Sequence, residues 1–273
     1  MKIEHIVSTM NRDNYDFLNE LHIQHNCLVI NQNMQERYEE FLMDGMLVRI
    51  ISTPERGLSN SRNMLLKNAE GDICIIGDDD VLYLDGYTQR IENAYETYPD
   101  ADIIAFLFTE EMGKDTRKRC VKAGRLNIFS ISKVASVEIT LKRKSILSKG
   151  LAFDSRIGLG SPFPLGEENA FLADALRAGL RIYQVPISIC FTQPVTASME
   201  QKWGNGFDKA YFVAKGAAFY RIYRHLFLLF AFAFILAKKR SLFKNVPLCK
   251  AAYWMIKGKR KYKFQGKESH NVS

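Results

Sequence analysis

The chain has 273 residues, of which 47% are hydrophobic and 25% charged, enough for one large α/β domain or for a domain with an appendage. This composition excludes a disordered or fibrous chain. The N-terminal residues contain no long apolar run, which argues against a secretory signal. The five cysteines lack metal-ligand spacing and predict buried, reduced thiols in a cytosolic chain: Cys27, Cys74, Cys120, Cys190 and Cys249.

Charge divides the chain near residue 200. Residues 1–200 carry 22 Lys and Arg against 28 Asp and Glu, whereas residues 201–273 carry 16 against 2. The net charge of +8 therefore comes from the C-terminal part. A basic segment of this kind suits nucleic acid or an anionic membrane surface, and composition alone leaves both open. We expect two parts, a domain over 1–200 and a helical extension over 201–273.

Short apolar runs alternate with helical patterns in the first part, which predicts βαβ units on a mostly parallel sheet. In chain order, the predicted strands are Ile3–Thr9, Cys27–Asn31, Leu47–Ser52, Ile73–Gly77, Ile103–Leu107 and Arg181–Val185. Helices are predicted over Leu58–Ala69, with Ser59 or Asn60 as the cap, over 86–97, and over 166–178, ending at Gly179.

Residues 110–165 are less regular and include a loop, 158–166, that is rich in Gly and Pro. Loops of this kind often carry binding residues. A plain connection built from turn residues explains the same composition, so both interpretations stay open.

An uninterrupted apolar run, LFLLFAFAFILA, occupies residues 226–237 between basic flanks. Its twelve residues are too few to cross a bilayer core, which takes about 20 at helical rise. The run predicts either a helix in the plane of an anionic membrane surface or a core helix docked on the first part. Aromatic and basic residues over Lys250–Lys263 favour the membrane surface.

Three consecutive carboxylates, Asp78, Asp79 and Asp80, directly follow the apolar strand over 73–77. Ligands bind at the carboxyl ends of strands in open α/β sheets. Adjacent carboxylates repel unless a cation or proton is shared between them, and oxygen ligands suit Mg²⁺ or Mn²⁺. The cluster therefore indicates a metal site that holds phosphate oxygens, although a solvated acidic turn is the simpler alternative.

Two further motifs stand at predicted helix starts. Residues 56–63, RGLSNSRN, offer donors to a diphosphate or nucleoside, or serve only to cap the helix. Glu167 and Glu168 follow Gly166. Glutamate in a first helical turn is favoured by the helix dipole alone, but a carboxylate there could also act as a general base toward a bound hydroxyl.

The motifs occur in a characteristic order: STMN over 8–11, VINQ over 29–32, GLSNSRN over 57–63, GDICIIGDDD over 71–80, GEENAF over 166–171 and GLRIYQVP over 179–186. In this combination residues 3–195 resemble the family 2 glycosyltransferases of bacterial polysaccharide biosynthesis. The resemblance implies a GT-A fold, that is, a Rossmann-like, mostly parallel sheet flanked by helices. It also implies a metal-dependent hexosyltransferase that uses Mn²⁺ or Mg²⁺.

The resemblance assigns roles to individual positions. Glu168 is the expected catalytic base, with Glu167 beside it, and Asp80 and Asp78 are the expected metal ligands. The residues expected to bind the nucleotide sugar are Ser8, Thr9, Asn31, Gln32, Arg62, Asn63, Asp78 and Asp79. Family members often carry a metal-binding His beyond the last core strand; residues 189–194 contain none, so Gln193 or water would substitute.

The expected reaction is transfer of a sugar, with inversion, from a nucleoside diphosphate donor, UDP-sugar being favoured, to a hydroxyl group. A glycan or lipid-linked glycan is the expected acceptor, at the cytoplasmic face of the cell membrane, with no nucleic acid as partner. A sugar-phosphate nucleotidyltransferase is disfavoured because residues 8–14 contain no glycine for a phosphate loop. A non-catalytic membrane-surface or nucleic-acid-binding protein is the alternative from another class.

Overall fold

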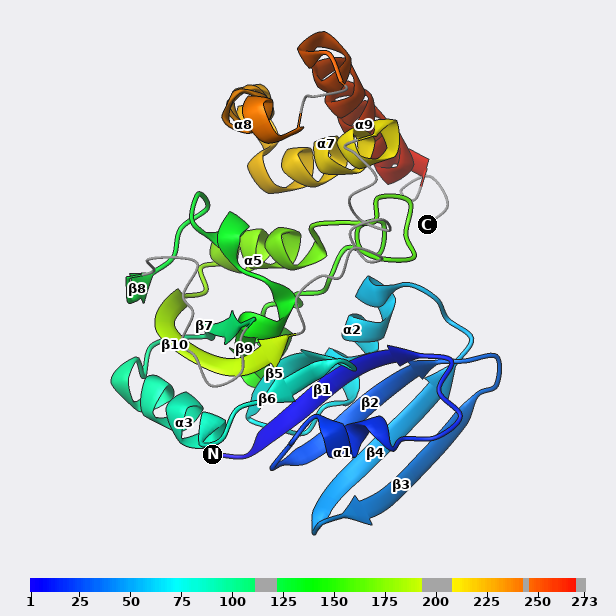
Figure 1. Ribbon diagram of the computed structural model, residues 1–273, viewed down its shortest axis with the longest axis vertical. Coiled ribbons are helices and arrows are strands. Elements are labelled where there is room, and N and C mark those ends of the chain that lie inside the picture. Colours follow the sequence, from blue (N-terminus) through cyan, green and yellow to red (C-terminus); the bar gives the residue numbers. More distant parts are fainter. Residues whose placement is uncertain (111–121, 193–207, 243–245, 269–273) are drawn as a thin grey trace.

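The computed structural model describes residues 1–110, 122–192, 208–242 and 246–268, and Figure 1 shows their arrangement. The strands are β1 (Ile3–Met10), β2 (Asn26–Gln32), β3 (Arg37–Met43), β4 (Met46–Thr53), β5 (Ile73–Asp78), β6 (Val81–Tyr83), β7 (Ile103–Thr109), β8 (Gly124–Arg125), β9 (Ile139–Lys142) and β10 (Ile182–Thr192). The α-helices are α1 (Phe17–Glu20), α2 (Leu58–Asn68), α3 (Tyr87–Thr97), α4 (Arg143–Ser148), α5 (Glu167–Arg177), α7 (Lys209–Tyr223), α8 (Phe227–Leu242) and α9 (Leu248–Glu268). Short 3₁₀ turns are η1 (Ile131–Lys133), η2 (Ser136–Glu138) and η3 (Arg224–Leu226).

The described strands form one mixed sheet in the order β3-β4-β2-β1-β5-β9-β7-β10-β6, with β8 beside β10. The strands β4, β2, β1 and β5 are parallel neighbours, as the alternating pattern predicts. The strand β9 is antiparallel to both of its neighbours, β5 and β7. All six predicted strands and all three predicted helices are present, and β3, β6, β8 and β9 are additions to that prediction.

Helices cover both faces of the sheet (Figure 1). One apolar cluster packs α1 and α3 against the sheet through residues such as Leu18 and Ile91. The other packs α2 and α5 through residues such as Leu65 and Phe171. Because side chains alternate along a strand, a sheet covered on both faces needs apolar residues at nearly every position. The nearly continuous burial of β2 and β5 agrees with this.

The helix α2 begins differently from the prediction. Its N-cap residue is Gly57, with φ of 107°, and no side chain caps it. The Ser59 hydroxyl instead donates to the carbonyl of Ile157 at 2.5 Å, and the Asn60 amide donates to the carbonyl of Arg56. The predicted capping by Ser59 or Asn60 is therefore wrong, because a tertiary contact occupies the Ser59 side chain and a local contact occupies that of Asn60. The predicted end of α5 is confirmed, since Gly179 has φ of 85°.

The C-terminal helices α7, α8 and α9 gather beyond α5 (Figure 1). From α7, Ala214 and Ala217 join the same apolar cluster as Phe171 of α5. The helices α7 and α9 cross closely, since a Cβ atom at Gly216 or at Gly258 would overlap the backbone of the other helix. The extension is thus packed onto the first part rather than tethered beside it.

Buried ion pairs fasten this extension. The Asp154 carboxylate, in the loop before α5, accepts hydrogen bonds from Arg156, from Arg221 of α7 and from Tyr262 of α9. Arg221 also pairs with Asp174 of α5. Burial opposes ionisation of Asp154, but the hydrogen bonds from Arg156 and Tyr262 outweigh it and lower the pKa.

The apolar run 226–237 combines features of both predictions for it. Phe227, Ala231 and Ile235 of α8 are buried among α7 and α9. The opposite face exposes large apolar side chains: Leu228 (62%), Leu229 (61%), Phe232 (62%) and Leu236 (49%). By length and composition, residues 209–237 could cross a membrane, but the left-handed backbone of Arg224 (φ 45°) separates α7 from α8.

The cysteines are mostly as predicted. Cys27, Cys74 and Cys190 are buried free thiols, whereas Cys249 is exposed on α9. The prediction of burial is therefore wrong for Cys249, and Cys120 lies outside the described residues.

Candidate functional site

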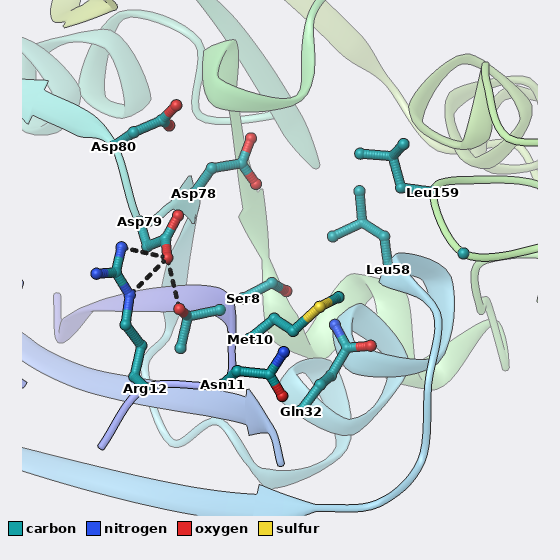
Figure 2. Close-up of a pocket in the computed structure, with 12 residues that line it drawn as sticks. Ser8, Met10, Asn11, Arg12, Gln32, Leu58, Asp78, Asp79, Asp80 and Leu159 are labelled. Carbon is teal, nitrogen blue, oxygen red and sulfur yellow. Dashed lines mark hydrogen bonds and ion pairs between the residues drawn. The ribbon is translucent and has the colours of Figure 1, made fainter. Parts of the chain in front are cut away.

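A cavity of about 500 Å³ opens at the carboxyl ends of β1, β2 and β5 (Figure 2). The strand register brings these ends together, because Ser8 pairs with Asp78 and Met10 pairs with Gln32. The residues that line the cavity are Ser8, Thr9, Met10, Asn11, Arg12, Gln32, Leu58, Asp78, Asp79, Asp80, Leu159 and Gly160. This edge is where open α/β sheets bind their ligands.

The three carboxylates have different partners. Asp79 accepts hydrogen bonds from Thr9 at 2.5 Å and from Arg12 at 2.9 Å, which Figure 2 shows as dashed lines. Asp78 pairs with Arg62 at 3.2 Å. Asp80 has no ion-pair partner in the described part of the chain. Burial, followed by the charges of Asp78 and Asp79, raises the pKa of Asp80.

A divalent cation fits this donor set. The raised pKa means that the Asp80 carboxylate lacks compensating positive charge, which a bound cation would supply. Asp78 and Asp80 are oxygen ligands of the kind that Mg²⁺ and Mn²⁺ prefer. The described residues contain no group of three or more His, Cys, Asp or Glu arranged as a complete metal site, so phosphate oxygens and water would complete the coordination. Gln193, the expected substitute ligand, lies outside the described residues.

The side chain of Arg62 connects the two acidic motifs. Only 1% of this α2 residue is exposed, and its guanidinium lies between Asp78 at 3.2 Å and Glu167 at 2.9 Å. Burial lowers the pKa of Arg62, but the charges of Asp78 and Glu167 outweigh this effect and raise it. Arg62 does not line the cavity, so its position is that of a buried link between β5 and α5.

Glu167 and Glu168 occupy the first turn of α5, after Gly166 in a left-handed conformation. Arg62 compensates the charge of Glu167. Glu168 has no comparable salt bridge, and burial, reinforced by the neighbouring Glu167 charge, raises its pKa to about 8. The two adjacent carboxylates therefore lie in different electrostatic environments. A carboxyl group that titrates near neutral pH is suited to general base catalysis.

Two asparagines predicted to contact the nucleotide have other partners. The Asn31 side chain bonds to both the N–H and the carbonyl of Arg12 and so fixes the loop after β1. The Asn63 side chain makes the same pair of bonds with Phe153. Neither residue lines the cavity. Ser8 does line it and accepts a hydrogen bond from Ser61 of α2.

Residues without a role predicted from the sequence also line the cavity, among them Met10, Asn11, Arg12 and Leu58. Leu159 and Gly160 lie within the Gly-rich loop over 158–166, for which a binding role is one of the two interpretations of the sequence. The carbonyl of Leu159 accepts a hydrogen bond from the N–H of Leu58. Polarity directly after a buried strand is the signal that could have identified Asn11 and Arg12. Met10 and Leu58 carry no such signal, because apolar residues are also expected in the core.

The glycosyl transferase family 2 profile matches residues 6–148, slightly more than half of the chain. The chain belongs to this family of glycosyltransferases. A comparison with curated proteins found no significant match.

Solved structures of similar fold include S. aureus TarS 1–349 in complex with UDP, with a TM-score of 0.58 at 12% identity, covering 98% of this chain and 92% of that one. The complex of TarS 1–349 with UDP-GlcNAc has a TM-score of 0.57 at 12% identity, covering 97% and 92%. The mannosyltransferase PcManGT from Pyrobaculum calidifontis, in complex with GDP-Man and Mn²⁺, has a TM-score of 0.54 at 14% identity, covering 97% and 87%. These similarities confirm the predicted GT-A fold.

The burial of Arg62 predicts that its substitution lowers the free energy of unfolding. Substitution of Arg62→Met would leave Asp78 and Glu167 unpaired, and we expect the free energy of unfolding to fall by about 3 to 5 kcal/mol. Arg12→Met removes a partly exposed ion pair with Asp79 and is expected to cost less than about 1 kcal/mol. Urea denaturation of both variants measures the difference. Equal costs would contradict the assignment of Arg62 as the link between the motifs.

Proposed function

We propose that this protein transfers a sugar from a nucleoside diphosphate sugar to a hydroxyl group of a glycan or lipid-linked glycan, with inversion at the anomeric carbon. The observation that carries the proposal is that Arg62 joins the acids of the cavity, through Asp78, to the Glu167–Glu168 pair. Donor binding and proton removal are the two functions that a direct displacement needs. The UDP, UDP-GlcNAc and GDP-Man complexes of similar structures support a nucleotide-sugar donor.

Residues of both acidic motifs have separate roles in the proposed reaction. Asp78 and Asp80 would hold a divalent cation, Mn²⁺ or Mg²⁺, and a bound cation would supply positive charge that stabilises the leaving diphosphate. Glu168 accepts the proton of the acceptor hydroxyl. At the same time the hydroxyl oxygen bonds to the anomeric carbon, and the bond between that carbon and the diphosphate breaks. Arg62 pairs with Glu167, whereas Glu168 has no salt bridge among the described residues and is the member of the pair that takes up the proton. The single displacement inverts the configuration.

The extension over 201–273 places this chemistry at an anionic membrane surface, from the cytoplasmic side. The exposed face of α8 is apolar, with Leu228, Leu229 and Phe232 more than half exposed. Exposed apolar patches of this size mark interaction sites. Sixteen basic residues in the extension favour anionic lipid as the partner. A lipid-linked acceptor would then be concentrated at the surface to which the enzyme binds.

The alternative is that the protein is not an enzyme and binds a membrane surface or nucleic acid. It predicts that no nucleoside diphosphate binds in the presence of Mn²⁺. It also leaves unexplained why the Asp cluster and the Glu pair contact one arginine. The first of the following experiments separates it from the proposal.

Calorimetric titration with UDP and GDP, with and without Mn²⁺, tests donor binding. We expect one nucleotide to bind in a metal-dependent way and the affinity to fall at least about tenfold in Asp80→Asn, because that variant loses a charged ligand. Asp85→Asn, at an exposed site after β6, is the matched control and should bind normally. Asp78 is avoided because its loss would remove one of the two carboxylates that pair with the buried Arg62. Absence of binding in the folded wild-type protein would favour the non-catalytic alternative.

The pKa of Glu168 predicts the pH dependence of the reaction. A base with a pKa of about 8 is protonated and inactive at lower pH, so kcat/KM should rise with pH through about 8. The assay is release of nucleoside diphosphate from the donor, with water as the acceptor. Glu168→Gln should lose about 10² to 10⁴ in rate and the pH dependence. The exposed Glu96→Gln should retain both, and an unchanged profile in Glu168→Gln would refute the base assignment.

The exposed face of α8 predicts membrane binding. The double variant Leu228→Gln/Phe232→Gln should bind vesicles containing phosphatidylglycerol at least about tenfold more weakly, because two apolar side chains no longer enter the lipid. Co-sedimentation measures the bound fraction. Leu42→Gln, at an equally exposed apolar residue of β3, is the control and should bind as the wild type does. Equal binding by the α8 variant would exclude this face as the contact.

A further inference from the structure

Gln32 is the last residue of β2 and lines the cavity, yet only 3% of it is exposed. Its acceptor atoms are occupied. The backbone carbonyl accepts from the N–H of Asn11 at 3.1 Å and from Arg56 at 2.7 Å. The side-chain oxygen, Oε1, accepts from the N–H of Gly57 at 2.7 Å.

The bond from Gly57 fixes the orientation of the amide. A backbone N–H can only donate, so the atom that faces it must be Oε1 and the other atom must be Nε2. Nε2 has no hydrogen-bond partner among the described residues, while the side chain borders the cavity. A buried side chain therefore presents an unused N–H donor to whatever fills this end of the cavity.

The two ends of the cavity differ in character. Met10, Asn11 and Leu58 lie near Gln32, whereas Asp78, Asp79 and Asp80 lie at the other end (Figure 2). The end at Gln32 combines apolar and neutral polar side chains and suits a flat ring with a polar edge, and the acidic end suits a metal-bound diphosphate. In a nucleotide laid along this axis, the base edge opposite the glycosidic bond points toward Gln32. That edge carries position 4 of a pyrimidine or position 6 of a purine.

We propose that Nε2 of Gln32 donates a hydrogen bond to a carbonyl oxygen at this position of the base, so that the site selects keto bases over amino bases. The inference rests on the proposed function, because it assumes that a nucleotide occupies the cavity. An amino group at the same position would set two donors against each other. A mismatched buried donor reduces affinity by about tenfold or more.

The wild-type protein provides a test that needs no variant. Two pairs of nucleotides differ at this edge by a carbonyl or an amine: UDP against CDP, and IDP against ADP. Calorimetric titration with Mn²⁺ should give, for whichever ring size binds, about tenfold or greater preference for the keto member. Equal affinity within the pair, or preference for the amino member, would overturn the proposal.

Two substitutions test the atom itself. Gln32→Glu keeps an oxygen for the Gly57 N–H and turns the donor into an acceptor, and Gln32→Met removes the donor without introducing a charge. We expect the keto-to-amino affinity ratio to fall about tenfold or more in both variants. Gln89→Glu, at an exposed site on α3 that bonds only to Asn93, is the control and should keep the wild-type ratio.

The outcomes separate this inference from the proposed function. An unchanged ratio in both Gln32 variants, with folding verified by circular dichroism, would refute the role of Gln32 while nucleotide binding stands. If the folded wild-type protein binds none of the four nucleotides, both proposals are refuted.

Discussion

The arrangement of the site depends on one buried side chain, the positively charged Arg62. The Arg62 guanidinium is almost fully enclosed, and its ion pairs with Asp78 and with Glu167, which lies 105 residues after Arg62, join the end of a strand to the start of a helix. Removing a guanidinium from water is costly, and paired charges with good geometry are what compensate for it. Because each partner of Arg62 neighbours a proposed functional residue, Asp80 or Glu168, the donor end and the base end of the site are held in one fixed relation.

Much of the fold can be predicted from local sequence. The strands β2, β5 and β7 have continuous apolar runs, those of β1 and β4 are interrupted by polar residues, and the acids directly follow the run of β5. The strand β9 could not be predicted in this way. Its four residues carry too short a pattern, and only pairing with β5 and β7 defines it as a strand. The strand β3 is mostly exposed, but the turn at Asp44 and Gly45 was a readable signal, since both have positive φ and Asp-Gly is a preferred hairpin turn.

The candidate site, too, could be predicted only in part from the sequence. The Asp cluster and Glu pair were identified from motifs, whereas the motif suggested that Arg62 and Asn63 contact the nucleotide. Their burial and partners follow from the packing of α2 against β5 and the loop at Phe153, which adjacent sequence does not encode. The orientation of the Gln32 amide likewise depends on Gly57, 25 residues away. Long-range contacts therefore decide which polar residues remain free for a ligand.

The close packing of the extension also limits how the chain can be divided. Ala214, Ala217, Ile222, Tyr223 and Tyr262 belong to the same apolar cluster as Phe171 and Leu172 of α5. A shortened protein ending near residue 200 would expose that face of α5 to water and leave Asp154 and Asp174 without the cation of Arg221. Such a fragment is a candidate for aggregation, and surface substitutions in the intact chain are the better way to produce a soluble enzyme for crystallisation.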